Sequence, residues 1–143
     1  EHEFLSLARS INNHMPEFTV KQLASGLSEV GIALKGSRIA LLGLAYKPNV
    51  ADDRESPSYK VLEYLEEKGA SVDTYDPYFL HKSTSKNLDD ALSNKDAVLV
   101  AVNHDKFLSM DLSRLKVKVF LDGKNAFNQD LLPKTVVYKG IGT

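Results

Sequence analysis

Short apolar runs separated by helical patterns constrain the fold of this chain more than any other feature. The first run, 37–44, reads SRIALLGL, which is typical of a parallel strand whose two faces are both covered. Further runs occupy 70–75, 97–102 and 117–121, and a shorter one occupies 135–138. The pattern predicts a buried sheet built from these segments.

Helical patterns fill the intervals between the apolar runs. Ser56-Pro57 is a good helix start, with Ser at the N-cap and Pro at the first helical position, and Lys68-Gly69 marks the end of that helix. Shorter helices are predicted around 88–93 and, in one or two pieces, within 107–115. Strand and helix alternate, so the sequence predicts an α/β fold, a Rossmann-like parallel sheet with helices on both faces and right-handed crossovers.

The amino-terminal segment has a helical period instead. An apolar stripe runs through Val20, Leu23, Leu27 and Val30, at the spacings that place residues on one helix face. Pro16 suits the first turn of a helix, so two helices in tandem and one helix kinked at this proline both fit. We therefore divide the chain into a helical segment, 1–34, and an α/β domain, 35–143.

Composition excludes several classes of function. The net charge is -1 and the basic residues are scattered, whereas binding to a phosphate backbone needs a concentrated basic face. No apolar run approaches the roughly 20 residues that cross a bilayer, and residues 1–4 show no signal-peptide pattern. The absence of cysteine fits a cytoplasmic protein and excludes thiolate metal sites. The histidines lack metal-ligand spacing, so we expect no nucleic acid, membrane or metal.

The loop after the first predicted strand is the first place to look for a ligand, because ligands bind at the carboxyl ends of such strands. Residues 43–57 read GLAYKPNVADDRESP and form neither a dinucleotide fingerprint nor a P-loop. Lys47 and Arg54 could hold a diphosphate beside the helix start. Alternatively, Arg54 pairs with a neighbouring acidic residue and Lys47 points into water.

Two further strand ends carry polar residues. Lys124 follows the run 117–121 and is placed either for a ligand contact or simply in a turn. His104 follows the run 97–102, where a lone histidine is more often a hydrogen-bonded loop residue than a catalytic base. Asp52 and Asp53 are adjacent in sequence and make a poor acid/base pair. These residues by themselves therefore predict no catalytic group.

A longer stretch carries a family resemblance. Residues 43–77, GLAYKPNVADDRESPSYKVLEYLEEKGASVDTYDP, resemble the signature of the UDP-glucose/GDP-mannose dehydrogenase family, at the start of its carboxy-terminal domain. Downstream, AVLVAVNHDKF and VFLDGKNAF look like later strands of that family, and upstream ARSINNHMPEF is similar to its linking helix. The resemblance spans nearly the whole chain.

The resemblance implies an activity that this chain alone would not have. Members of the family oxidise the C6 alcohol of a UDP-sugar to a carboxylate in two hydride transfers to NAD, which is bound mainly by an amino-terminal domain. That domain and a cysteine nucleophile are absent from these 143 residues. We therefore expect an excised, inactive UDP-sugar-binding domain. The alternative is a free-standing nucleotide-binding or dimerisation module of the same fold, without catalysis.

The resemblance also implies roles for particular residues. Tyr46 and Lys47 would contact the nucleotide sugar, and Arg54 would lie toward NAD. Lys124 stands where many relatives use an arginine on the substrate, so it keeps the charge and loses the bidentate fork.

Assembly and substrate follow from the same likeness. Linking helices of the family form a dimer core, which predicts a homodimer through the stripe at Val20, Leu23, Leu27 and Val30. The other reading is that this stripe packs against its own domain. The segment MPEF at 15–18 most resembles the sequence of members that oxidise UDP-N-acetylhexosamines, such as UDP-N-acetylmannosamine.

Overall fold

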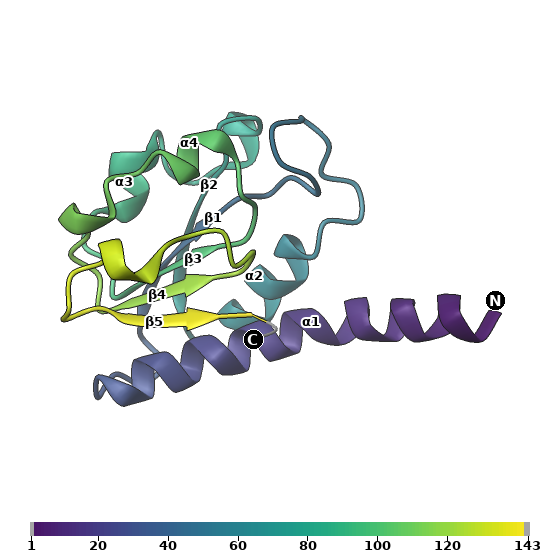
Figure 1. Cartoon of the computed structure of the whole chain (residues 1–143), viewed down its shortest axis with the longest axis horizontal. Helices are drawn as coiled ribbons and strands as arrows, with labels where there is room; N and C mark the ends of the chain where they lie inside the picture. The colour runs from purple at the N-terminus through teal and green to yellow at the C-terminus, as the bar shows by residue number, and fades with distance from the viewer. Residues whose placement is uncertain (1, 142–143) are drawn as a thin grey trace.

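The computed structural model describes the backbone of residues 2–141 and the side chains of residues 15–141. The helices and strands alternate as Figure 1 shows. In chain order they are α1 (His2–Glu29), β1 (Arg38–Leu42), α2 (Ser58–Glu67), β2 (Ser71–Tyr75), α3 (Leu88–Leu92), β3 (Ala97–Val100), α4 (Asp105–Leu108), β4 (Val119–Asp122) and β5 (Val137–Gly140). Single 3-10 turns lie at η1 (Leu80–Lys82), η2 (Leu112–Arg114) and η3 (Gln129–Leu131).

The strands form one parallel sheet in the order β2-β1-β3-β4-β5. The chain adds β2 on one side of β1 and then crosses back to place β3 on the other side. Strand order therefore reverses between β1 and β3, which is the point where open α/β sheets bind their ligands. The predicted fold class is confirmed.

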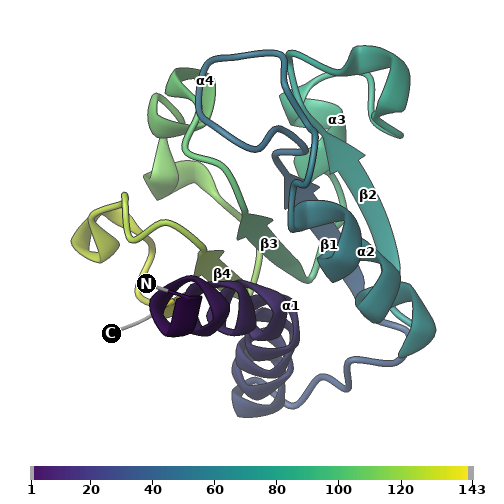
Figure 2. The same ribbon diagram turned by 90° about the vertical axis from the view of Figure 1, so that its right-hand side faces the viewer.

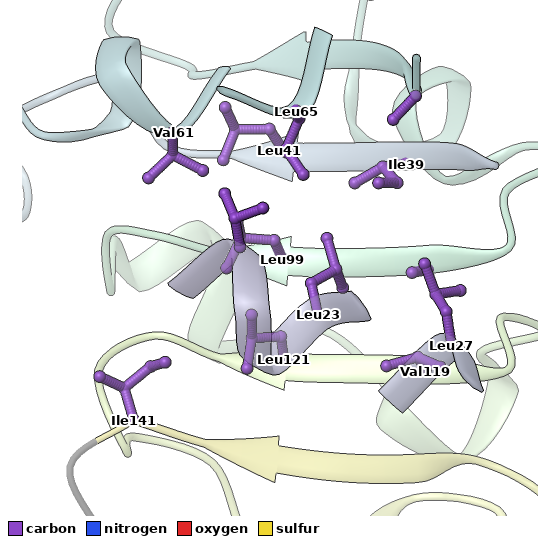
Figure 3. Close-up of a cluster of buried hydrophobic side chains, with 13 residues drawn as sticks. Leu23, Leu27, Ile39, Leu41, Val61, Leu65, Leu99, Val119, Leu121 and Ile141 are labelled. Atoms are coloured by element: carbon purple, nitrogen blue, oxygen red, sulfur yellow. The ribbon is translucent and has the colours of Figure 1, made fainter. Parts of the chain in front are cut away.

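Alternate residues of each strand supply two separate cores. Ile39 and Leu41 face α1 and α2, as the close-up in Figure 3 shows, while Ala40 and Leu42 face the side of the sheet that α3 covers. Both faces are buried because helices cover both, which explains why the strands read as continuous apolar runs. Figure 2 shows α1 and α2 side by side over one face.

Helix α1 is one continuous helix that contains Pro16, so of the two possibilities the single helix is correct. Its apolar stripe packs on its own sheet: Val20, Leu23 and Leu27 are buried, with Leu23 and Leu27 fully inaccessible. Of the two readings, packing against its own domain therefore holds for Val20, Leu23 and Leu27, and a homodimer through the amino-terminal helix stays a prediction. An amphipathic period indicates that a face is buried, and it does not indicate against what.

We expect Leu23→Ala to cost about 2–5 kcal/mol of folding free energy, because it removes a fully buried side chain and leaves a cavity. The exposed Lys21 lies two residues earlier on the same helix, and Lys21→Ala should change stability by less than about 0.5 kcal/mol. Urea unfolding at several protein concentrations measures both. A Leu23→Ala chain as stable as the wild type would contradict the packing described here.

Element boundaries differ from the sequence predictions by a few residues. Strand β5 lies two residues later than predicted, and the expected helix within 107–115 is the pair α4 and η2. At the start of α2, Pro57 already has helical dihedrals and the Ser56 hydroxyl accepts the Ser58 amide hydrogen at 3.3 Å. Within the described residues, no helix is long and apolar enough to cross a membrane.

Candidate functional site

Gly43 turns the chain out of β1 at the point where strand order reverses. Its φ is +108°, and its amide donates to the Tyr75 carbonyl at 2.9 Å. A Cβ at this position would lie 2.7 Å from Val102 Cβ and 2.8 Å from the Val102 backbone nitrogen. Glycine therefore lets the loops after β1 and β3 approach each other closely.

A backbone hydrogen bond closes the loop after β1 at its base. The Tyr46 amide donates to the Asp52 carbonyl at 2.7 Å, so the two ends of segment 46–52 lie side by side. Arg54 donates to the Asp52 carboxylate through Nε and Nη2, both at 3.0 Å. These hydrogen bonds from the Arg54 side chain lower the pKa of Asp52 to about 2. Glu55 follows with φ +60°, a left-handed conformation that is uncommon for glutamate.

A cleft of about 640 Å³ opens beside this loop. It lies between α1 and the start of α2, over the carboxyl ends of β3 and β4. Its lining is mixed in character, and comprises Met15, Pro16, Thr19, Tyr46, Glu55, Ser56, Pro57, Ser58, Lys60, Val61, Tyr64, Leu99, Ala101, Gly123 and Lys124. Aromatic rings, hydroxyls and cations thus surround one space of the size that small ligands occupy.

The residues expected at the site fall into two groups. Tyr46 and Lys124 come from different strand ends and line the same cleft. Lys47 and Arg54 belong to the same loop as Tyr46 but lie off the cleft. Lys47 is exposed, and the Arg54 side chain is 86% exposed and ion-paired with Asp52. The structure therefore brings one cation and one aromatic ring of the predicted set together.

Asp122, at the end of β4, organises the turn that carries Lys124. Its carboxylate accepts the amide of Lys124 at 3.2 Å, two further amides of the turn, and the Tyr138 hydroxyl at 2.8 Å. Burial has the largest effect on the pKa of Tyr138 and this hydrogen bond the second largest, and together they raise it to about 12. A Cβ on Gly123 would lie 2.5 Å from the Val100 carbonyl oxygen, so the turn also packs tightly on β3.

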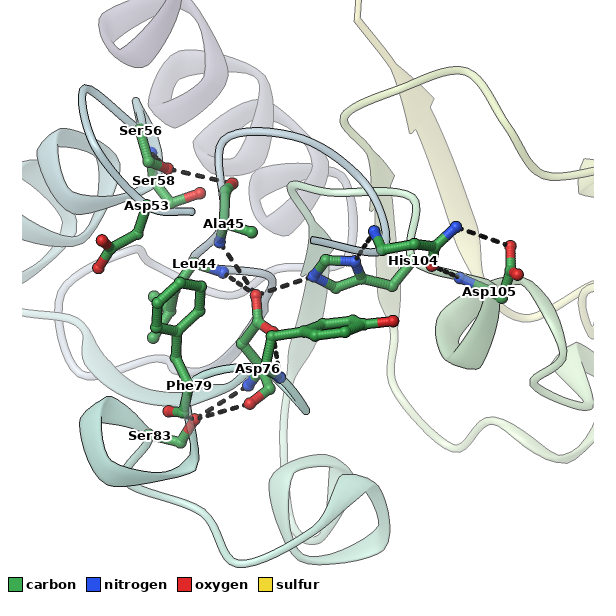
Figure 4. A network of polar contacts seen from close by, with 12 residues as sticks. Leu44, Ala45, Asp53, Ser56, Ser58, Asp76, Phe79, Ser83, His104 and Asp105 are labelled. Carbon is green, nitrogen blue, oxygen red and sulfur yellow. Dashed lines mark hydrogen bonds and ion pairs between the residues drawn. The ribbon is translucent and has the colours of Figure 1, made fainter. Parts of the chain in front are cut away.

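Sequence reasoning missed a buried polar pair below the loop. Asp76 and His104 are both fully inaccessible, and His104 Nε2 lies 2.9 Å from Asp76 Oδ2. The same carboxylate accepts the amides of Leu44 at 2.7 Å and Ala45 at 3.0 Å, as Figure 4 shows. Two signals were available, namely an aspartate directly after β2 and the expectation that His104 is a hydrogen-bonded loop residue, but neither identified the other as its partner 28 residues away.

A second missed contact ties the loop to the turn after β2. Lys82 Nζ donates to Asp53 Oδ2 at 2.6 Å, and the Tyr59 hydroxyl donates to the same oxygen. These hydrogen bonds lower the pKa of Asp53, and the one from Lys82 has the largest effect. Asp53 therefore stabilises the conformation of the loop. Among residues whose side chains are described, no group of three or more metal-ligating side chains occurs.

A family model described as the UDP-glucose/GDP-mannose dehydrogenase family, UDP binding domain, matches residues 40–129. The chain belongs to this family. It is 36% identical over 142 residues to the UDP-N-acetyl-D-mannosamine dehydrogenase of Methanococcus maripaludis, covering 92% of this chain and 32% of that relative. A UDP-glucose 6-dehydrogenase of Rhizobium meliloti is 31% identical over 120 residues, covering 76% of this chain and 28% of the relative.

Solved structures agree with the assignment of this UDP-binding domain. The UDP-D-ManNAc dehydrogenase of Pyrococcus horikoshii superposes with a TM-score of 0.86 at 33% identity, over 95% of this chain and 32% of that one. The NDP-N-acetyl-D-galactosaminuronic acid dehydrogenase of Methanosarcina mazei gives 0.88 at 31% identity, over 96% and 31%. The chain therefore spans about a third of the length of the relatives it matches.

Proposed function

We propose that the cleft beside the β1–α2 loop binds the UDP part of a UDP-sugar, and that the chain serves as the carboxy-terminal domain of an NAD-dependent UDP-sugar 6-dehydrogenase. One observation carries the proposal. Tyr46 and Lys124, expected at the substrate from separate motifs, line one cleft at the point where strand order reverses. The family membership supplies the ligand class.

The chemistry of the cleft suits a nucleoside diphosphate. Lys124 and Lys60 offer cations for phosphate oxygens, and such charge-assisted contacts are the strong ones. The amides at the start of α2 add partial positive charge. Tyr46 is 46% exposed and offers a ring face against which a base can pack. Glu55 can accept hydrogen bonds from sugar hydroxyls.

Lys47 and Arg54 lie outside the cleft, and both side chains are exposed. We assign Lys47 to the phosphates or the sugar, and Arg54 to the NAD side. A dinucleotide does not fit the loop itself, because residues 43–57 contain a single glycine where the fingerprint needs three. The NAD-binding site and the cysteine nucleophile would therefore lie in another part of the protein. We expect this chain to bind the ligand without oxidising it.

Substrate and assembly complete the proposal. Several relatives are named UDP-N-acetyl-D-mannosamine dehydrogenases, which favours that sugar over glucose. A homodimer through the amino-terminal helix would have to use the part of α1 that extends beyond the α/β body in Figure 1, since the stripe from Val20 to Leu27 is buried. A cytoplasmic location remains the expectation from the cysteine-free sequence.

Titration of the chain with UDP, UDP-N-acetylmannosamine and NAD tests this function. We expect both uridine compounds to shift the amide resonances of residues 43–57 and Lys124, and NAD alone to shift few. Lys124→Ala should weaken UDP binding about 10-fold, as loss of one charge-assisted contact implies. The exposed Lys86 lies away from the cleft, and Lys86→Ala is the matched control. Equal affinities of both variants, or no shifts at millimolar UDP, would reject the proposal.

A further inference from the structure

The apex of the β1–α2 loop is fastened to the start of α4. Asn49 has φ +63°, and its backbone amide donates to His104 Nδ1 at 2.8 Å. Its side chain forms a reciprocal pair with Asp105: Nδ2 donates to the carboxylate at 3.2 Å, and the Asp105 amide donates to Asn49 Oδ1 at 2.9 Å. Three hydrogen bonds therefore join the apex to the segment that follows β3.

The bond to His104 fixes the tautomer of its ring. A backbone amide can only donate, so Nδ1 must be the unprotonated nitrogen of the imidazole. Its proton then resides on Nε2 and is donated to Asp76 Oδ2 at 2.9 Å. Tyr78 covers the ring, with centroids 4.8 Å apart. Asp76 thus orients the histidine so that its acceptor faces the loop.

Asp76 holds the base of the same loop. Its carboxylate accepts the amides of Leu44 and Ala45, the two residues that precede Tyr46. Figure 4 shows the carboxylate between these amides and the imidazole. One buried group thereby fixes both the root of the loop and, through His104, its apex, while Tyr46 and Lys47 lie between these two anchors.

We propose that His104, oriented by Asp76, is a positioning residue that presents the ligand-binding loop, and that its Nδ1 acceptor sets the affinity for the uridine nucleotide. The histidine does not touch the ligand, since it is fully buried and does not line the cleft. Pre-organising the loop removes the entropic cost of ordering it on binding. This inference rests on the proposed function of the cleft.

Two substitutions of His104 separate its two hydrogen bonds. His104→Asn places an amide oxygen close to the position of Nδ1 and can still accept from Asn49, while losing the contact with Asp76. His104→Gln reaches Asp76 and removes the acceptor for Asn49. We expect the Asn49 amide to stay protected from hydrogen exchange in His104→Asn and to exchange at least 10-fold faster in His104→Gln. UDP affinity should stay within about two-fold in the first variant and fall about 10-fold in the second.

A loss of stability alone would not produce that pattern. Leu27→Ala serves as the control, because Leu27 lies beside Val119 at the beginning of β4 (Figure 3), away from the loop, and should lower the unfolding temperature without affecting Asn49 protection or affinity. Imidazole nitrogen shifts of the wild type should report a proton on Nε2. The inference fails if that proton is on Nδ1, if both His104 variants lose affinity equally, or if His104→Gln binds UDP normally. If wild-type chain binds no uridine nucleotide, the proposed function fails, and Asn49 exchange still decides whether His104 holds the apex.

Discussion

Gly43→Ala should destabilise the domain by about 2–5 kcal/mol, the combined cost of a positive φ and of overpacking. The φ of +108° is unfavourable for any L side chain. In addition, the new Cβ would lie within 2.8 Å of the Val102 backbone nitrogen, which cannot move without disturbing the segment that follows β3. Equilibrium unfolding in urea measures the loss.

Gly36 provides the matched control for this substitution. Its φ is +83° and a Cβ there would meet nothing within 4 Å, so Gly36→Ala should cost only about 1 kcal/mol, the backbone part of the penalty. The difference between the two variants isolates the close approach of the loops after β1 and β3. Equal losses in both would contradict the tight packing described for Gly43.

Asp76→Ala should cost about 3–5 kcal/mol at pH 7, since it leaves four donors, most of them buried, without an acceptor. The donors are the amides of Leu44, Ala45 and Tyr78 and the ring of His104. Asp130→Ala, at an exposed aspartate, should change stability by less than about 0.5 kcal/mol. A loss below 1 kcal/mol for Asp76→Ala would mean that other groups satisfy these donors.

The effect of Asp76 should also depend on pH. Burial raises the pKa of this carboxyl, but hydrogen bonds from His104 and from the amides of Tyr78, Leu44 and Ala45 outweigh burial and leave the pKa below the ordinary value of 3.8. The folded state therefore favours the ionised form. The resulting stabilisation is present above pH 3.8 and is lost as the pH falls through the depressed folded value. The gap between wild type and Asp76→Asn should narrow over that acidic range.

Much of the fold could be predicted because its signals are local. Covered parallel strands read as apolar runs, and Ser56-Pro57 starts a helix through its own dihedrals and hydroxyl. The fate of the α1 stripe could not be predicted, because burial against a sheet and burial against a partner produce the same periodicity. The residue types at Val20 and Leu23 suit both kinds of buried contact.

For the candidate site, the residues that line the cleft were easier to predict than the residues that hold its loops in place. Tyr46 and Lys124 follow strands whose carboxyl ends must meet at one edge. The contacts of Asp76 with His104 and of Asp53 with Lys82 join residues 28 and 29 positions apart, and no short motif encodes them. For Arg54, the alternative of pairing with a neighbouring acidic residue holds, and the partner is Asp52.

The wall that α1 contributes to the cleft has a thermodynamic consequence. Met15, Pro16 and Thr19 belong to the first half of the helix and also line the cleft, so the position of this part of α1 sets one side of the space available to a ligand. A ligand that prefers one width thereby prefers one helix orientation, and linkage makes this preference mutual. If the cleft binds the nucleotide as proposed, a partner that binds one orientation of α1 and the nucleotide change each other's dissociation constant by the same factor.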